Sequence, residues 1–311
     1  MNRKDVVAQL LESIGMPAGH ALPDDVARLQ VHGNKVVGSH LVPGLRVEVE
    51  EQPDGIAAHI ACQAGTQIVK PVHICFGLLP ERGVQHILLD IAMEEESRAS
   101  VLAHCTFPNA VEVQHKMDAR IRIGPHAIYS YLERHVHGDK GGVEVLPKAE
   151  VTIEEGGRFR TEFELIRGRA GRIAFDYAAV CYERSVLEMI ARISGRGNDV
   201  IEIRESGNLI GAESRAVLKT SIALRDEARA DVYNSIVAEG AHARGHVDCK
   251  EIVQGRALAR AVPVVEVRNP TAHVTHEAAI GSVDSRQLET LMSRGLSEDE
   301  AVELIIQGML S

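Results

Sequence analysis

The pattern that most constrains the fold of this chain is a run of short alternating segments from about residue 31 to residue 267. Polar and apolar residues alternate within segments such as Leu45–Glu50 and Ala149–Glu154, and this period of two is typical of β-strands. Glycine pairs such as Gly156-Gly157 mark turns between the segments. Because no long helical pattern interrupts the run, it argues against a Rossmann or α/β-barrel fold and leaves a sandwich, a barrel or a β-solenoid.

The length of the run favours the solenoid among these three folds, because a sandwich of this size usually divides into two domains. No exact repeat in the sequence decides the choice. Aromatic residues make up only 3% of the chain and tryptophan is absent. The prediction is therefore a mainly β protein whose core consists of aliphatic side chains.

The charge of the chain excludes two classes of partner. The formal net charge is −10, and no block of basic residues occurs. Nucleic acids and anionic membranes bind clustered Lys and Arg, so neither is expected as a partner. The amphipathic start of the chain does not read as an export signal, and no apolar stretch approaches the roughly 20 residues that span a bilayer. We therefore expect a cytoplasmic protein.

Histidine and cysteine supply the candidate chemistry, because the chain contains 15 His and five Cys. Thiolate and imidazole select iron–sulfur species, zinc or copper over magnesium. Three local groups stand out: His104-Cys105 with His115, His135-x-His137, and Cys249 with His276-Glu277. The other three cysteines lie in apolar runs and are expected to be reduced thiols that pack in the core: Cys62, Cys75 and Cys181.

His135 and His137 would lie on the same face of a strand and could share a metal. Two histidines on a solvent-facing strand are, however, more often surface residues. No Gly-rich loop ending in Gly-Lys-Ser/Thr, no Gly-x-Ser-x-Gly and no Cys-x-x-Cys occurs in the sequence. Any nucleotide energy must therefore come from another subunit.

The last residues predict a helical hairpin. Gly295 is placed to end a first helix, and Ser297 with Glu300 forms a capping box for a second. The apolar positions of the two helices are Leu288, Leu291, Met292, Leu304 and Ile305. The hairpin is either a lid over an open end of the β core or a docking platform for a partner, and local physics alone favours the lid.

The C-terminal third resembles the SufB/SufD family of iron–sulfur cluster assembly proteins. The matching segments run in the family's order: Gly245–Lys250 (GHVDCK), Thr275–Gly281 (THEAAIG), Arg294–Ser297 (RGLS) and Ala301–Gly308 (AVELIIQG). A second match upstream is Leu102–Pro108 (LAHCTFP). The resemblance implies a right-handed parallel β-helix over residues 31–281, with an N-terminal helical segment over 1–30 and a C-terminal helical domain over 282–311.

The resemblance also implies partners and site residues. It makes the C-terminal helices the binding site of a SufC-type ABC ATPase, so the docking interpretation becomes the preferred one. Cys249, Glu277 and His276 match positions at which the cluster forms, and Cys105 matches the cysteine at which sulfur enters. Because the chain has the cysteine, the glutamate and the histidine together, it resembles SufB or a single-chain scaffold that pairs with itself.

The resulting hypothesis is a cytoplasmic assembly scaffold that is not itself an enzyme. It would hold a transient iron–sulfur cluster built from iron and sulfide or persulfide, receive sulfur from a donor protein and pass clusters to acceptor apoproteins. It would form a homodimer, or a heterodimer with a SufB/SufD paralogue. Two alternatives stay open: a metal-dependent enzyme centred on His135 and His137, and a purely structural solenoid that binds a protein partner.

Overall fold

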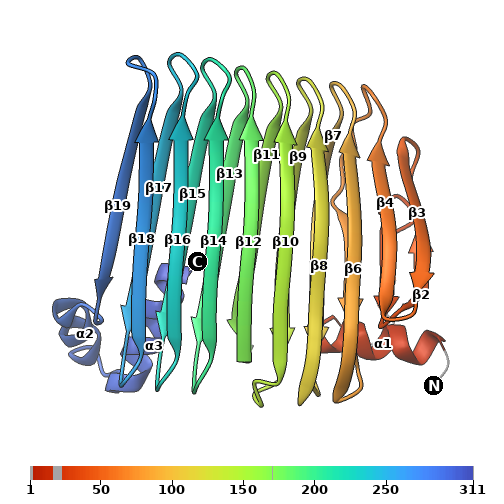
Figure 1. Ribbon diagram of the computed structural model, residues 1–311. Helices are drawn as coiled ribbons and strands as arrows, with labels where there is room; N and C mark the ends of the chain where they lie inside the picture. The colour runs from red at the N-terminus through yellow and green to blue at the C-terminus, as the bar shows by residue number, and fades with distance from the viewer. Residues whose placement is uncertain (1–2, 17–22, 170, 311) are drawn as a thin grey trace.

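The protein is a parallel β-solenoid of about eight turns with helices at both ends of the chain (Figure 1). The computed structural model describes residues 3–16, 23–169 and 171–310. The strands of the first sheet are β1 (Arg28–His32), β2 (Lys35–His40), β5 (Val72–Gly77), β7 (Arg98–Phe107), β9 (Ile128–His137), β11 (Arg158–Arg167), β13 (Val186–Gly195), β15 (Arg215–Leu224), β17 (Arg244–Val253) and β19 (His273–Gly281). Those of the second sheet are β3 (Leu45–Gln52), β4 (Gly55–Cys62), β6 (Arg82–Met93), β8 (Glu112–Ile123), β10 (Val143–Ile153), β12 (Gly171–Cys181), β14 (Val200–Leu209), β16 (Arg229–Ala238) and β18 (Leu258–Val267).

The strand order shows how the chain winds. From β4 onward, successive strands alternate between the two sheets, and each pairs in parallel with the strand two positions further along the chain. This order confirms the solenoid and excludes the sandwich and the barrel. Two antiparallel pairs, β1 with β2 and β3 with β4, form the N-terminal end. The strand run begins at Arg28, slightly before the predicted position 31.

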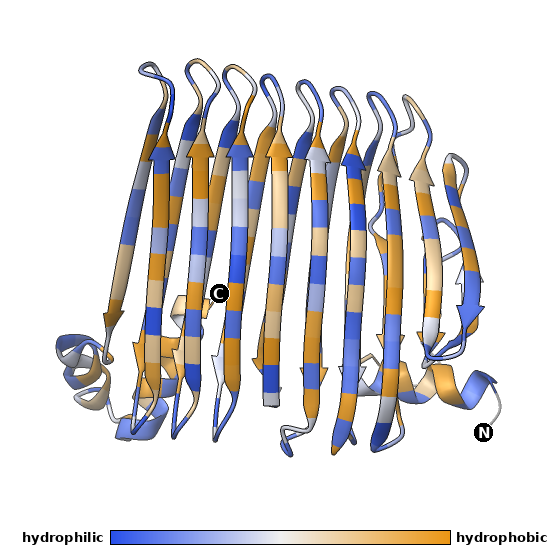
Figure 2. Cartoon of the chain, in the orientation of Figure 1, coloured by the Kyte–Doolittle hydropathy of each residue, from blue (hydrophilic) through white to orange (hydrophobic). Residues whose placement is uncertain are grey.

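The core lies between the two sheets and is filled by every second residue of each strand. Strand β14, for example, alternates between buried and more exposed positions along its length, and Figure 2 shows the same banding on the strands that face the viewer. Parallel register stacks like positions of successive turns, as in Ile91, Ile121 and Val151. The aliphatic core predicted from composition is therefore confirmed.

The terminal helices pack outside this core. Helix α1 (Arg3–Ser13) buries Val6 and Leu10 against Cys75 and Leu79. The predicted hairpin is confirmed as α2 (Ser285–Met292) and α3 (Glu298–Leu310), which runs on past Gly308. Gly295 has φ +97°, as expected of a left-handed cap. Ser297 N–H and Oγ–H both donate to Glu300 Oε2, at 2.8 and 2.7 Å.

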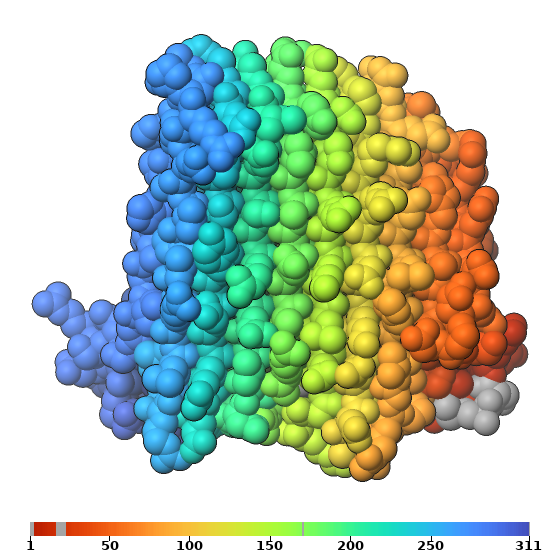
Figure 3. All heavy atoms as spheres, viewed as in Figure 1, coloured from red at the N-terminus to blue at the C-terminus, as the bar shows by residue number. Residues whose placement is uncertain are grey.

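The hairpin does not cover the end of the solenoid. Val302 and Ile306 of α3 pack on Ala223 and Ile252, which lie on the outer face of the first sheet. Strand β19 remains exposed along nearly its whole length. The lid interpretation is therefore wrong, and Figure 3 shows the C-terminal helices projecting from a lower corner of the molecule. Among the described helices, none has the length and apolarity needed to cross a bilayer.

Candidate functional site

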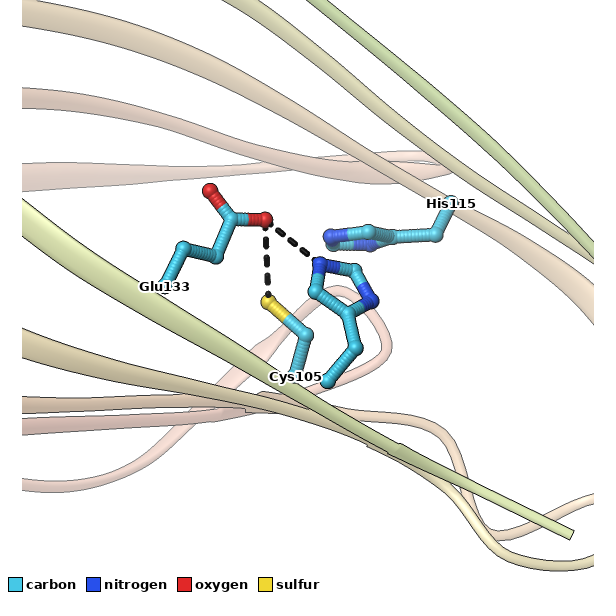
Figure 4. A group of neighbouring side chains, drawn as sticks. Cys105, His115 and Glu133 are labelled. Carbon is cyan, nitrogen blue, oxygen red and sulfur yellow. Dashed lines mark hydrogen bonds and ion pairs between the residues drawn. The ribbon is translucent and has the colours of Figure 1, made fainter. Parts of the chain in front are cut away.

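Four side chains with metal-binding atoms converge inside the first turns of the solenoid (Figure 4). Cys105 on β7 and His135 on β9 are lateral neighbours in the first sheet. Glu133 lies two residues before His135 and therefore on the same inward face. His115 comes from β8 in the opposite sheet. The ligand atoms of all four residues lie within 4.8 Å of one another.

Hydrogen bonds link this interior group into a chain. Glu133 Oε1 lies 2.6 Å from His135 Nε2 and accepts from Cys105 Sγ at 3.6 Å. His135 Nδ1 lies 3.1 Å from His137 Nε2. His137 Nδ1 lies 3.2 Å from the carbonyl oxygen of Arg169. All five side chains of the group are buried.

Burial dominates the electrostatics of the group. It lowers the pKa of His115 to about 3 and raises the pKa of the Cys105 thiol well above its ordinary value, with the Glu133 charge adding to the latter shift. Burial alone would raise the pKa of Glu133, but the hydrogen bond and charge of His135 outweigh it, and the pKa is lowered. The site therefore favours a neutral thiol beside a carboxylate that is hydrogen-bonded to the His135 imidazole.

Sequence analysis predicted some of the residues in this interior group and missed others. The prediction that His135 and His137 share one face is confirmed, but the interpretation as surface residues is wrong, because both are buried. His104 lies on the opposite face of β7 from Cys105 and does not join the group. Glu133 was missed. Its place two residues before His135, in a strand that otherwise reads as amphipathic, is the signal that could have found it.

Cys249 lies in the interior near the other end of the solenoid. Five strand-to-strand steps separate β7 from β17, which corresponds to roughly 24 Å. Asn234 Nδ2 is 3.9 Å from Cys249 Sγ and 2.8 Å from Thr220 Oγ1. Burial, followed by the charges of Glu251 and Glu205, raises the pKa of Cys249 to about 12. The surroundings of this thiol are therefore acidic and favour a cation.

His276 and Glu277 lie on β19, the strand next to Cys249. In the register of this pair, Cys249 is opposite Ala278, His276 is opposite Val247 and Glu277 is opposite Asp248. Strand geometry puts the Cα atoms of Cys249 and His276 roughly 8 Å apart. His276 shares the inward face with Cys249, whereas Glu277 falls on the opposite face. Both side chains are exposed, because β19 is the last strand of the sheet among the described residues.

The predicted docking residues are only partly accessible. Met292 and Leu304 are 42% and 49% exposed, whereas Leu288, Leu291 and Ile305 are half-buried. Leu288 and Ile305 pack toward the solenoid with Val302 and Ile306. The three remaining cysteines are buried, so their predicted packing role is confirmed for Cys62, Cys75 and Cys181.

The fold and the interior thiols define a class: a two-sided β-solenoid with soft-metal ligands inside and a helical hairpin outside. Residues 80–309 match the family described as "SUF system FeS cluster assembly, SufBD core domain". The chain is 37% identical to an iron–sulfur cluster assembly SufBD family protein of Pyrococcus horikoshii over 92% of this chain and 87% of that protein. It is 34% identical to one of Methanocaldococcus jannaschii over 100% and 99% of the two chains. The chain belongs to the SufBD family.

Proposed function

We propose that this protein is the scaffold on which an iron–sulfur cluster is assembled, with Cys249 as the thiol that takes part in cluster formation. The observation that carries the proposal is the place of Cys249: an interior thiol one strand away from an exposed terminal strand that bears His276 and Glu277. A thiol and an imidazole on one inward face are soft ligands for iron. Family membership supports the general role in iron–sulfur cluster assembly.

The acidic surroundings of Cys249 favour iron over a free anion. Glu205 and Glu251 are buried, and none of their carboxylate oxygens has a hydrogen-bond partner among the described residues. Burial raises the pKa of Glu205 to about 8 and that of Glu251 to about 7. A ferrous ion entering this region would let these groups and the thiol lose their protons, because metal binding is coupled to deprotonation of the ligands.

A second copy of a SufB/SufD chain would complete the site. The inward face of the last turn includes Val265 and Val267 of β18 and Ile280 of β19, and no later turn in the described part of the chain covers it. A partner copy, identical or paralogous, would bury these residues and enclose His276. Glu277, on the other face of β19, would then reach the cluster only after rearrangement of this strand or from the partner copy.

Sulfur would enter at Cys105 and travel through the interior to Cys249. Buried polar side chains line the way from the second sheet: Tyr177 pairs in register with Glu205, and Glu205 with Asn234. Cys105 is enclosed, so the donor protein requires an opening of the solenoid. A SufC-type ABC ATPase bound at α2 and α3 would supply that motion, and the finished cluster would pass to acceptor proteins in the cytoplasm.

Anaerobic reconstitution with iron and sulfide tests the proposal. Cys249→Ala should lose most of the visible absorbance of the cluster, because the substitution removes the thiolate that binds iron. Cys181→Ala is the matched control, since Cys181 is equally buried but lies among apolar residues. Equal cluster absorbance in the two variants would show that Cys249 is not the assembly residue.

A further inference from the structure

We propose that the protein holds one divalent transition-metal ion inside the solenoid, bound by Cys105, His115, Glu133 and His135, at a site separate from Cys249. Among the residues that the structure describes, this is the one group of three or more Cys, His, Asp or Glu whose ligand atoms lie so close together. The inference goes beyond the proposed function, because the ion is not the cluster that the scaffold passes on. It would occupy Cys105 while no sulfur is bound there and would leave when that thiol accepts sulfur.

The backbone preorganises the four ligands. Cys105 and His135 are held side by side by the parallel register of β7 and β9. The alternation of β9 aims Glu133 at the same interior space, and His115 reaches it from β8 across the core. Because all four residues lie within regular strands, no loop has to close when an ion binds, and the cost of ordering the site has been met by folding.

The charges of the group match a divalent cation. Glu133 and Cys105 are buried, and neither has a Lys or Arg hydrogen-bond partner among the described residues. The Glu133 carboxylate instead contacts His135 and Cys105, and the Nδ1 atom of the buried His115 has no hydrogen-bond partner within the described chain. A thiolate and a carboxylate together supply two negative charges, while the two imidazoles stay neutral. An ion of charge +2 would neutralise the site.

A chain of histidines sets the tautomer that a metal requires. The carbonyl oxygen of Arg169 can only accept, so His137 Nδ1 donates to it. A buried imidazole without a carboxylate partner is neutral, so His137 Nε2 accepts from His135 Nδ1–H. This leaves the lone pair of His135 on Nε2, the atom that faces Glu133. His137 is thus a positioning residue for the ligand His135.

The 2.6 Å contact between His135 Nε2 and Glu133 Oε1 then requires one shared proton, because both atoms are otherwise acceptors. An incoming ion would replace this proton and that of the Cys105 thiol, so two protons leave as one divalent cation binds. In the metal-free site, the shared proton therefore occupies the position between imidazole and carboxylate that the ion would take.

The ligand set selects the kind of metal. One sulfur, two nitrogens and one oxygen suit zinc or ferrous iron in a tetrahedral site, whereas magnesium and calcium prefer oxygen alone. Phe107 packs on the rings of His115 and His137, with ring centroids 4.9 and 5.4 Å apart. Four protein ligands and an apolar wall leave no position for a substrate, which favours a stored, displaceable ion over a hydrolytic centre.

Cobalt binding tests the site without any cluster chemistry. The chelator-treated full-length chain is titrated anaerobically with Co²⁺, without ATPase or sulfur donor. We expect about one equivalent bound, with the visible bands of tetrahedral cobalt and a thiolate-to-cobalt charge-transfer band. Cys105→Ser should lose the charge-transfer band, and His137→Phe should weaken binding about 10–100-fold. Cys181→Ser, at a thiol that is equally buried but lies among apolar residues, should bind as the unsubstituted chain does.

Parallel titrations with Zn²⁺ and Fe²⁺ distinguish the two natural candidates by their relative affinities. Thermal unfolding of each variant checks its fold, and added metal should raise the unfolding temperature of the unsubstituted chain but not that of Cys105→Ser. An octahedral cobalt spectrum without charge transfer, or loss of binding in Cys249→Ser but not in Cys105→Ser, would overturn the inference. Cluster assembly at Cys249 is tested separately, by the anaerobic reconstitution of Cys249→Ala with iron and sulfide.

Discussion

Glu205 shows how a single buried carboxyl couples folding to pH. Neither of its oxygens has a hydrogen-bond partner among the described residues, and burial raises its pKa from 4.5 to about 8. Between these two pH values the folded chain keeps a proton that the unfolded chain releases. The stability contributed by this proton is complete below pH 4.5 and is lost as the pH rises toward about 8.

The substitution Glu205→Gln should remove this dependence. Relative to the unsubstituted chain, the free energy of unfolding of the variant should rise by about 1.4 kcal/mol per pH unit across the window. Chemical denaturation at several pH values measures it. Glu202→Gln, a half-buried position on the outer face of the same strand whose carboxylate pairs with Arg172 near the surface, should change stability by less than about 1 kcal/mol. A constant difference between Glu205→Gln and the unsubstituted chain at every pH would contradict the assigned pKa.

The candidate site was predictable residue by residue only where the chemistry is local. His135 and His137 share a face by strand alternation, which sequence alone shows. To predict that Cys105 and His135 are neighbours, one must know how the residues of successive turns align. Side chains that hydrogen-bond across neighbouring turns are 28, 29 or 30 residues apart, and this uneven spacing, without repeated residues, hid the period. Glu133 could not be recognised before that register was known.

At the scale of the elements, tight turns between strands leave no room for side chains at certain positions. A Cβ on Gly240 would lie 1.9 Å from the carbonyl oxygen of Gly211 in the preceding turn of the solenoid. A Cβ on Gly281, at the end of β19, would have nothing within 4 Å. The close stacking of successive turns therefore requires glycine at the first position and not at the second.

Gly240→Ala should accordingly lower the free energy of unfolding by about 1–3 kcal/mol, because the backbone of one turn must shift away from the next. Gly281→Ala should leave it nearly unchanged. Thermal or denaturant unfolding of the two variants makes the comparison. Equal stability of the two would mean that the turns are not stacked as closely as described.

The elements themselves were largely predictable, and their packing partners were not. The capping box at Ser297 and the glycine cap at Gly295 set the C-terminal hairpin by local hydrogen bonds, which short sequence motifs encode. Whether the hairpin closes the solenoid or lies on its side depends on which outer residues are apolar. Ala223 and Ile252 provide that surface, but in the sequence they cannot be told from inward-facing residues of the same strands.

At the scale of the whole molecule, the proposed dimer depends on the uncovered last turn. Ile280 is 47% exposed at this end, although its position in the register is an inward one. Ile280→Asp should convert the proposed dimer to a monomer, because a charge would be buried within the contact. Light scattering on the purified chain measures the mass.

Val217→Asp is the control for this substitution. Val217 is 37% exposed, but it lies on the outer face of β15, away from the last turn. The substitution Val217→Asp should therefore leave the oligomeric state unchanged. If the unsubstituted chain is already a monomer, the self-paired form of the proposal is wrong and only pairing with a paralogue remains. If Ile280→Asp is still a dimer, the contact between copies does not lie at the last turn.

The antiparallel pairs at the N-terminal end make the two ends of the solenoid unlike. The last turn offers an apolar parallel surface, whereas the first end finishes in the short strand β2 and in β3, which carries Glu48, Glu50 and Glu51. Acidic residues on an edge strand discourage further strand addition. Acidic residues at the first end would therefore oppose the growth of a filament, and the proposed contact through the last turn would cover the apolar end of the described solenoid, so that assembly stops at two copies.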